Sequence, residues 1–144
     1  ELQSEVHERA ATLDAVDVIT FDSHLELMME KATGVVAMGG YNTFCEILSL
    51  DKPALIMPRV APRMEQLVRA QRARELGVAR MFETSDTARL EDFVIALQEL
   101  PHQAKPSSAM LPGFLDGIEN VGKLAGRHFH PNVDRQLSLV KTGG

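Results

Sequence analysis

Residues 35–46 read Val-Val-Ala-Met-Gly-Gly-Tyr-Asn-Thr-Phe-Cys-Glu, and no other stretch of the chain says as much about its fold. Four apolar residues that end at a glycine pair predict a strand buried on both faces, followed by a tight turn. Thr43 and Glu46 have the spacing of a capping box, which predicts that a helix begins there. A strand, a turn and a helix in this order are typical of α/β proteins.

The same alternation continues on both sides of this unit. β-Branched or apolar runs predict further strands at 16–21, 53–57 and 78–82. Apolar residues at helical spacing predict helices over 1–13, 23–32, 63–76 and 90–97, and Gly77 is a suitable residue to end the third of them. Short connections between strands and helices predict an α/β fold with a Rossmann-like parallel sheet flanked by helices.

The C-terminal part of the chain differs in composition. Residues 101–112 contain three prolines and a serine pair, which predicts a linker. A last helix follows, with an apolar face that we expect to pack on this domain or on another one; this face carries Phe114, Ile118, Val121 and Ala125. We therefore expect a domain over residues 1–127 and a tail over 128–144.

Composition narrows the function classes. A chain of 144 residues with 44% hydrophobic and 24% charged residues suits one globular domain. A net charge of -5 argues against a dedicated nucleic-acid binder. The single cysteine, Cys45, excludes an internal disulfide and a cysteine-based metal cluster. The chain begins at Glu1, without methionine and inside a helical pattern, so we expect it to be part of a longer protein. The single cysteine fits a reducing compartment and no apolar run approaches about 18 residues, so we expect a cytoplasmic protein without a membrane span.

Two readings of the glycine pair stay open. Gly39 and Gly40 allow a phosphate to approach the backbone at the start of a helix, but they also suit a turn that binds nothing. Neither a dinucleotide fingerprint nor a P-loop lysine accompanies them. Glu46 can accept hydrogen bonds from both hydroxyls of a ribose, or it can complete the capping box with Thr43.

A basic segment follows the strand predicted at 53–57. It contains six arginines and only two acids, Glu65 and Glu75; the arginines are Arg59, Arg63, Arg69, Arg72, Arg74 and Arg80. Arg59 and Arg63 lie in a loop bounded by prolines at the end of the strand, where a guanidinium can bind a pyrophosphate in a bidentate manner. We expect Arg72, Arg74 and Arg80 to be ordinary surface residues. The chain has no Asp-x-Asp pair, so we expect no metal at this site.

Residues 35–77 as a set resemble the C-terminal, donor-binding domain of glycosyltransferases with the GT-B fold. They are similar in particular to the bacterial peptidoglycan N-acetylglucosaminyltransferase family. The motifs that carry the resemblance are Met38-Gly39-Gly40-Tyr41-Asn42-Thr43 with Glu46, Lys52-Pro53, Pro58-Arg59, Glu65-Gln66 and Arg69-Ala70. A looser resemblance in the order of helices and strands extends over residues 5–125.

The resemblance implies a nucleoside diphosphate sugar as ligand, with no cofactor. By position, the pyrophosphate and the neighbouring sugar would be held by Gly39, Gly40, Asn42 and Thr43, and Glu46 would bind ribose. Gln66 would bind sugar hydroxyls beside Glu65, where the family commonly has aspartate or glutamine. The resemblance also implies an N-terminal acceptor domain absent from this chain, and it is compatible with peripheral association of the parent protein with a membrane. The full donor-site prediction comprises Gly39, Gly40, Tyr41, Asn42, Thr43, Glu46, Arg59, Arg63, Glu65 and Gln66.

Two other functions remain open at this point. A nucleotide-sugar 2-epimerase shares the fold and the ligand, but it needs acid and base carboxylates, for which only Glu46 and Glu65 are candidates. A non-catalytic regulatory module with a Rossmann-like fold would bind no nucleotide at all.

Overall fold

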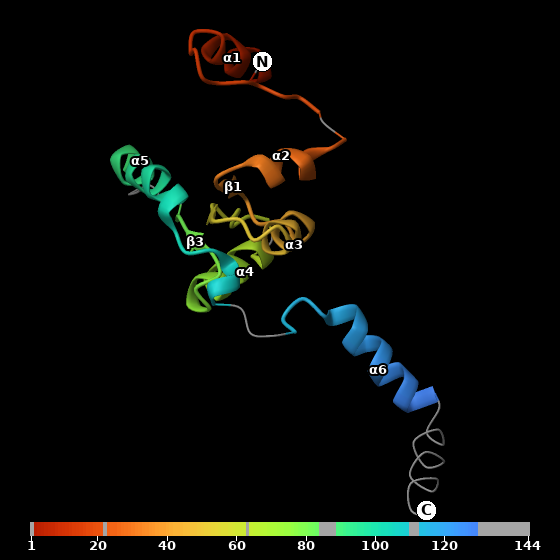
Figure 1. Ribbon diagram of the computed structural model, residues 1–144. Helices are drawn as coiled ribbons and strands as arrows, with labels where there is room; N and C mark the ends of the chain where they lie inside the picture. Colours follow the sequence, from red (N-terminus) through yellow and green to blue (C-terminus); the bar gives the residue numbers. More distant parts are fainter. Residues whose placement is uncertain (1, 22, 63, 84–88, 110–112, 130–144) are drawn as a thin grey trace, which may run out of the picture.

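The computed structural model describes residues 2–21, 23–62, 64–83, 89–109 and 113–129. Its sheet has three parallel strands in the order β1 (Val35–Ala37), β2 (Ala54–Ile56) and β3 (Arg80–Met81) (Figure 1). Val35 lies opposite Ala54 in the register, and Ile56 lies opposite Met81. Each connection between strands contains a helix, which confirms the predicted α/β fold with a parallel sheet.

Helices surround this sheet. α3 and α4 pack on one face, and α5 lies on the other side of the strands from α3 (Figure 1). Short 3₁₀ turns, η1 and η2, follow α5. The bounds of these elements are α1 Leu2–Ala10, α2 Leu25–Lys31, α3 Tyr41–Ser49, α4 Glu65–Glu75, α5 Leu90–Glu99, η1 Leu100–His102, η2 Pro106–Ser108 and α6 Gly117–Phe129.

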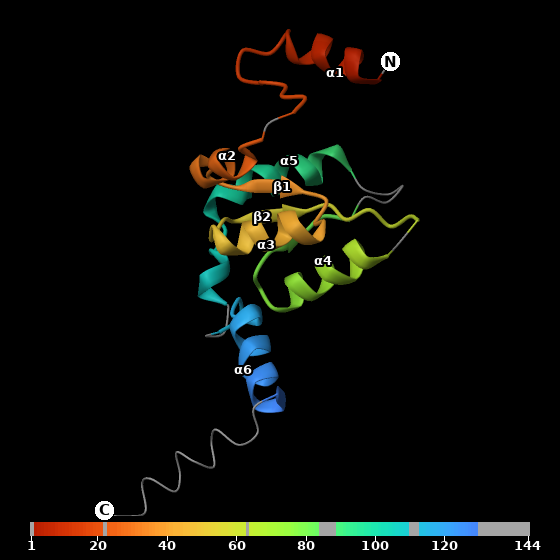
Figure 2. The same cartoon turned by 90° about the vertical axis from the view of Figure 1, so that its right-hand side faces the viewer.

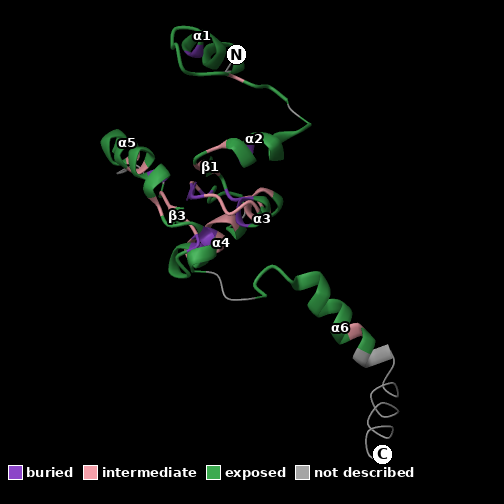
Figure 3. Cartoon of the chain, in the orientation of Figure 1, coloured by how far each residue is buried: buried purple, intermediate pink, exposed green. Residues whose placement is uncertain are grey.

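The core lies between the sheet and the pair α3 and α4. Ile47 of α3, Ile56 of β2 and Ala70 of α4 are each at most 1% exposed and pack in one cluster. Alanines at the contact, Ala54 and Ala70, let the helices lie close to the strands. Figure 3 shows that the buried residues gather around the strands, α3 and α4. A rigid core directly behind the turn after β1 gives that turn a fixed support.

The prediction that residues 35–38 are buried on both faces is wrong. Val36 is 41% exposed and Met38 is 53% exposed, whereas all three residues of β2 are buried. β2 is the central strand, with a neighbour on each side and helices over both faces. β1 is an edge strand of the described sheet, so its side chains receive less cover.

The strand predicted at 16–21 is also wrong. Residues 16–21 have no strand structure, and Val16, Ile19 and Phe21 are 48%, 51% and 86% exposed. In Figure 2 this segment runs between α1 and α2, away from the sheet. A strand needs a neighbour to receive its backbone hydrogen bonds, and a β-branched composition alone does not supply one.

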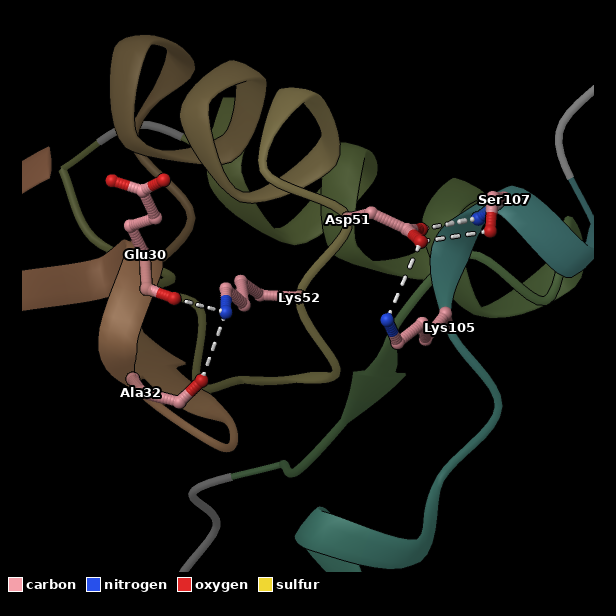
Figure 4. Close-up of polar contacts among 6 residues, drawn as sticks. All are labelled: Glu30, Ala32, Asp51, Lys52, Lys105 and Ser107. Carbon is pink, nitrogen blue, oxygen red and sulfur yellow. Dashed lines mark hydrogen bonds and ion pairs between the residues drawn. The ribbon is translucent and has the colours of Figure 1, made fainter. Parts of the chain in front are cut away.

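Part of the predicted linker packs against the domain. Pro106 of η2 is among the most deeply buried residues of the described chain, and Leu100 of η1 is 6% exposed. Next to Pro106, Ser107 donates hydrogen bonds to Asp51 from its backbone N–H (2.8 Å) and its hydroxyl (2.9 Å) (Figure 4). Pro101 is the second residue of η1 and Pro106 is the first residue of η2, and neither position needs an N–H donor within its turn. Residues 110–112 lie outside the described part.

The residue after Asp51 fastens the other side of the domain. Lys52 Nζ donates hydrogen bonds to the backbone oxygens of Glu30 and, at 3.1 Å, of Ala32, at the C-terminal end of α2 (Figure 4). An ammonium group at a helix C-terminus is favoured by the helix dipole. The loop between α3 and β2 therefore holds α2 on one side and η2 on the other.

The last helix does not cover its apolar face on this domain. α6 extends away from the sheet in Figures 1 and 2. Ile118, Val121 and Leu124 are 92%, 65% and 63% exposed. Phe114, which precedes α6, lines a hollow together with Val68 and Leu76 at α4, so only this end of the predicted face lies against the domain. Residues 130–144, most of the predicted tail, lie outside them.

Candidate functional site at the carboxyl edge of the sheet

The candidate site begins where the strands end. The turn after β1 and the loop after β2 lie at the same end of the sheet (Figure 2). A hydrogen bond of 2.8 Å from the backbone N–H of Met57 to the oxygen of Ala37 joins the two exits. Ligands of open α/β sheets bind at this edge.

Gly39 makes the turn after β1. It has a φ of +77°, and a Cβ placed on it would lie 2.7 Å from Cγ2 of Ile56. Both the backbone conformation and the space therefore exclude a side chain. Gly40 is different, because a Cβ there would meet nothing within 4 Å. The space in front of Gly40 is open to a ligand.

Helix α3 starts directly behind that space with an uncapped N-terminus. Gly40 is its N-cap, so no side chain caps the helix, and the first turn has no acidic residue. The first backbone bond of the helix joins Phe44 N–H to the oxygen of Gly40 at 2.9 Å. The N–H groups of Tyr41, Asn42 and Thr43 precede it and have no acceptor among the described residues. Free N–H groups and a positive helix end favour an anion here.

The capping box predicted for Thr43 and Glu46 is wrong. The helix begins at Tyr41, so Thr43 is its third residue and Glu46 its sixth. Neither residue makes a capping hydrogen bond. Packing of Phe44 and Ile47 on the core sets where this helix begins, since both fill the space against the strands.

Glu46 is consequently available to a ligand. Its side chain is exposed and has no hydrogen bond or ion pair with any described residue. Asn42 lies four residues earlier, so the two side chains share one side of α3. Side chains on a helix lean towards its N-terminus, which places the carboxylate on the same side as the free N–H groups. Of the two readings of Glu46, the structure removes the capping box.

The loop after β2 carries a second set of polar groups. Gln66 is half-buried, and its Oε1 accepts a hydrogen bond of 3.1 Å from the backbone N–H of Arg59. The guanidinium of Arg59 and the amide nitrogen of Gln66 have no partner within the described ranges. Arg59 also borders a hollow of about 500 Å³, lined otherwise by Val36, Ala37, Met38, Met57 and Pro58. A mostly apolar hollow beside a guanidinium suits a flat organic group attached to an anion.

The remaining predicted residues of this loop have simpler roles. Glu65 is the first residue of α4, where the positive end of the helix dipole stabilises its carboxylate. It is exposed and unpaired among the described residues. Arg63 lies outside the described residues.

One residue of the site was missed by the sequence prediction. Arg69 of α4 donates a hydrogen bond of 2.7 Å from Nη1 to the backbone oxygen of Gly39, and its guanidinium lies 5.6 Å from the centre of the Tyr41 ring. Its position one turn after Gln66 was visible in the sequence and indicates a shared helix side. Its acceptor was not, because a backbone oxygen 30 residues away has no sequence signature.

The other arginines of the basic segment are surface residues, as predicted. Arg72 pairs with Glu75 at 2.8 Å, Arg74 pairs with Glu83 at 3.4 Å, and Arg80 pairs with Glu99; all six side chains are at least half exposed. Among the described arginines of this segment, Arg59 is therefore the one whose guanidinium is free for a ligand close to the sheet edge.

The described residues contain no cluster of three or more histidine, cysteine or acidic side chains that could hold a metal ion. None of the described helices combines the length and the apolar character needed to cross a bilayer.

Comparison with known proteins assigns the family. The sequence profile of the glycosyltransferase family 28 C-terminal domain matches residues 1–121, most of the chain. Searches against curated proteins and against solved structures gave no significant match. The chain belongs to the glycosyltransferase family 28 C-terminal domains, the sugar-donor-binding halves of glycosyltransferases.

Proposed function

We propose that this domain binds a nucleoside diphosphate sugar across the carboxyl edge of its sheet. The observation that carries the proposal is the open, uncapped N-terminus of α3 behind Gly39 and Gly40. A helix end without a cap leaves backbone donors unsatisfied, and a diphosphate can satisfy several of them at once.

The neighbouring side chains fit the other parts of such a ligand. Glu46 can accept hydrogen bonds from both hydroxyls of a ribose. Arg59 can pair with phosphate oxygens, and the amide nitrogen of Gln66 can donate to a sugar hydroxyl. The hollow beside Arg59 can receive a flat apolar part of the ligand.

The reaction proposed for the parent protein is transfer of the sugar by displacement at its anomeric carbon. The diphosphate leaves with increased negative charge on its oxygens. Donors that are fixed in advance at that position lower the barrier, because they need no rearrangement when the charge develops. An N-terminal domain is proposed to bind the acceptor and to supply the base that activates it.

Titration of the ¹⁵N-labelled chain with UDP, and in parallel with ADP and GDP, tests the proposal. We expect the amides of residues 39–43 and of Glu46 to shift first, together with Arg59. Inorganic pyrophosphate is the control for charge alone and should leave Glu46 unchanged. Absence of any shift at these amides up to millimolar nucleotide would contradict the proposal.

A further inference from the structure

We propose that Arg69 is a positioning residue that sets the glycine turn for donor binding, an inference that rests on the proposed donor site. The basis is its pair of contacts with that turn. One is the hydrogen bond of 2.7 Å to the oxygen of Gly39, and the other is the cation–π contact with Tyr41 at 5.6 Å.

The two contacts lie on either side of Gly40. Gly39 supplies the residue with positive φ, and Tyr41 is the first residue of α3. Fixing both residues fixes the peptide groups between them, and with them the direction of the free N–H groups. The oxygen of Gly39 is held towards α4, so it does not compete with the oxygens of a diphosphate as an acceptor for the free N–H groups of α3.

Arginine is well suited to this role. Its guanidinium is planar, so it can donate to a carbonyl oxygen while its face lies on an aromatic ring. Arg69 is half-buried, and this contact is less screened by water than the exposed ion pairs of Arg72 and Arg74. A charged donor to a backbone oxygen is also stronger than a neutral one.

The same helix holds the second loop of the site. Gln66, one turn before Arg69, accepts the N–H of Arg59, so residues of α4 hold both the turn after β1 and the loop after β2. Arg69 therefore acts on the ligand through the backbone rather than by touching it. A turn that is already in its binding conformation loses less entropy when the ligand binds.

Three variants test this role in the chain: Arg69→Ala, Arg69→Lys and, as the matched control on the exposed side of α4, Arg72→Ala. In the ligand-free state we expect Arg69→Ala to shift and broaden the amide signals of residues 39–42, while Arg72→Ala leaves them unchanged. UDP affinity should fall about tenfold or more in Arg69→Ala, as expected for loss of a charged hydrogen bond that orders the site. Arg69→Lys, which keeps a charged donor but not the planar group, should restore part of both effects.

The outcomes separate this inference from the proposed function. Unchanged amide signals in Arg69→Ala would overturn the positioning role, whether or not the wild-type chain binds UDP. Altered signals with wild-type UDP affinity would overturn it as well. If the wild-type chain binds no nucleotide, the proposed function fails, and the ligand-free spectra still decide whether Arg69 sets the turn.

Discussion

The two ends of the sheet differ in how far their polar groups are paired within the domain. At the amino end, Asp51 and Lys52 use their charged groups on other parts of the domain, with Ser107 and with the last carbonyl oxygens of α2 (Figure 4). At the carboxyl end, the first N–H groups of α3 and the carboxylate of Glu46 have no partner among the described residues. Unsatisfied polar groups cost stability unless water or a ligand satisfies them. The amino end therefore holds the domain together, and the carboxyl end remains open for a ligand.

The largest effect is expected at the amino end. Asp51→Ala removes the acceptor of both hydrogen bonds from Ser107 and leaves alanine at a φ of +52°. Because the Asp51 side chain is 33% exposed, we expect a loss of about 2 kcal/mol in the free energy of unfolding, near the middle of the range for such bonds. Urea denaturation measures this loss. UDP affinity at native conditions should not change.

Asp51→Asn is the matched control, since asparagine tolerates positive φ and keeps one acceptor. It should lose less stability than Asp51→Ala. Equal stability of Asp51→Ala and the wild type would show that η2 is held by the burial of Pro106 alone. Reduced UDP affinity in Asp51→Ala would show that the two ends are coupled.

The second largest effect is expected at the carboxyl end, on the affinity for UDP. Glu46→Gln should weaken UDP binding about tenfold, because a charged acceptor of two hydroxyl groups is stronger than a neutral one. Its melting temperature should equal that of the wild type, since Glu46 has no partner among the described residues. Calorimetric titration and thermal denaturation give the two quantities. The 2′,3′-dideoxyribose analogue of UDP, which lacks both hydroxyls, should bind both proteins equally if the ribose hydroxyls are the partners.

A reversed pattern would revise the role of Glu46. If Glu46→Gln lowers the melting temperature and leaves the affinity for UDP unchanged, the carboxylate stabilises α3 and has no ligand. Glu65→Gln is a useful comparison, because Glu65 lies at the start of α4, where the helix dipole favours a negative charge. That variant should lose a little stability.

Local sequence patterns predicted the sheet and the turn after β1, but not the contacts between residues that are distant in sequence. The apolar runs around Val35 and Leu55 and the glycine pair gave the parallel sheet and the position of the turn, because both follow from residues adjacent in sequence. Pairing is not local, and residues 16–21 therefore had strand composition without forming a strand. The prolines and serines of 101–112 are as compatible with a linker as with the two 3₁₀ turns that form. The contact of Ser107 with Asp51 decides between them, and no local pattern indicates it.

The start of α3 shows the same limit at the candidate site. Thr43 with Glu46 and Gly40 are both acceptable helix starts by local rules. Packing of Phe44 and Ile47 on the core selects Gly40, and this choice leaves the helix end open. Arg69 was missed for a related reason, because its partner is a backbone oxygen. The features that make the site open are thus the ones that depend on tertiary structure.

The smallest effect on stability is expected for a substitution that caps the open N-terminus of α3. Gly40 has φ -54° and ψ 151°, an extended conformation that asparagine adopts without strain, and its Cβ would meet no atom within 4 Å. Gly40→Asn should place a side-chain oxygen on the free N–H groups of α3 and raise the free energy of unfolding by a few tenths of a kcal/mol, about 0.3. The same cap should compete with a diphosphate, so UDP affinity should fall as stability rises. Gly40→Ala is the control without a capping group, and it should show no gain in stability. A gain in stability without any loss of affinity would mean that the diphosphate does not use the N-terminus of α3, and the donor site would then have to be sought around Arg59.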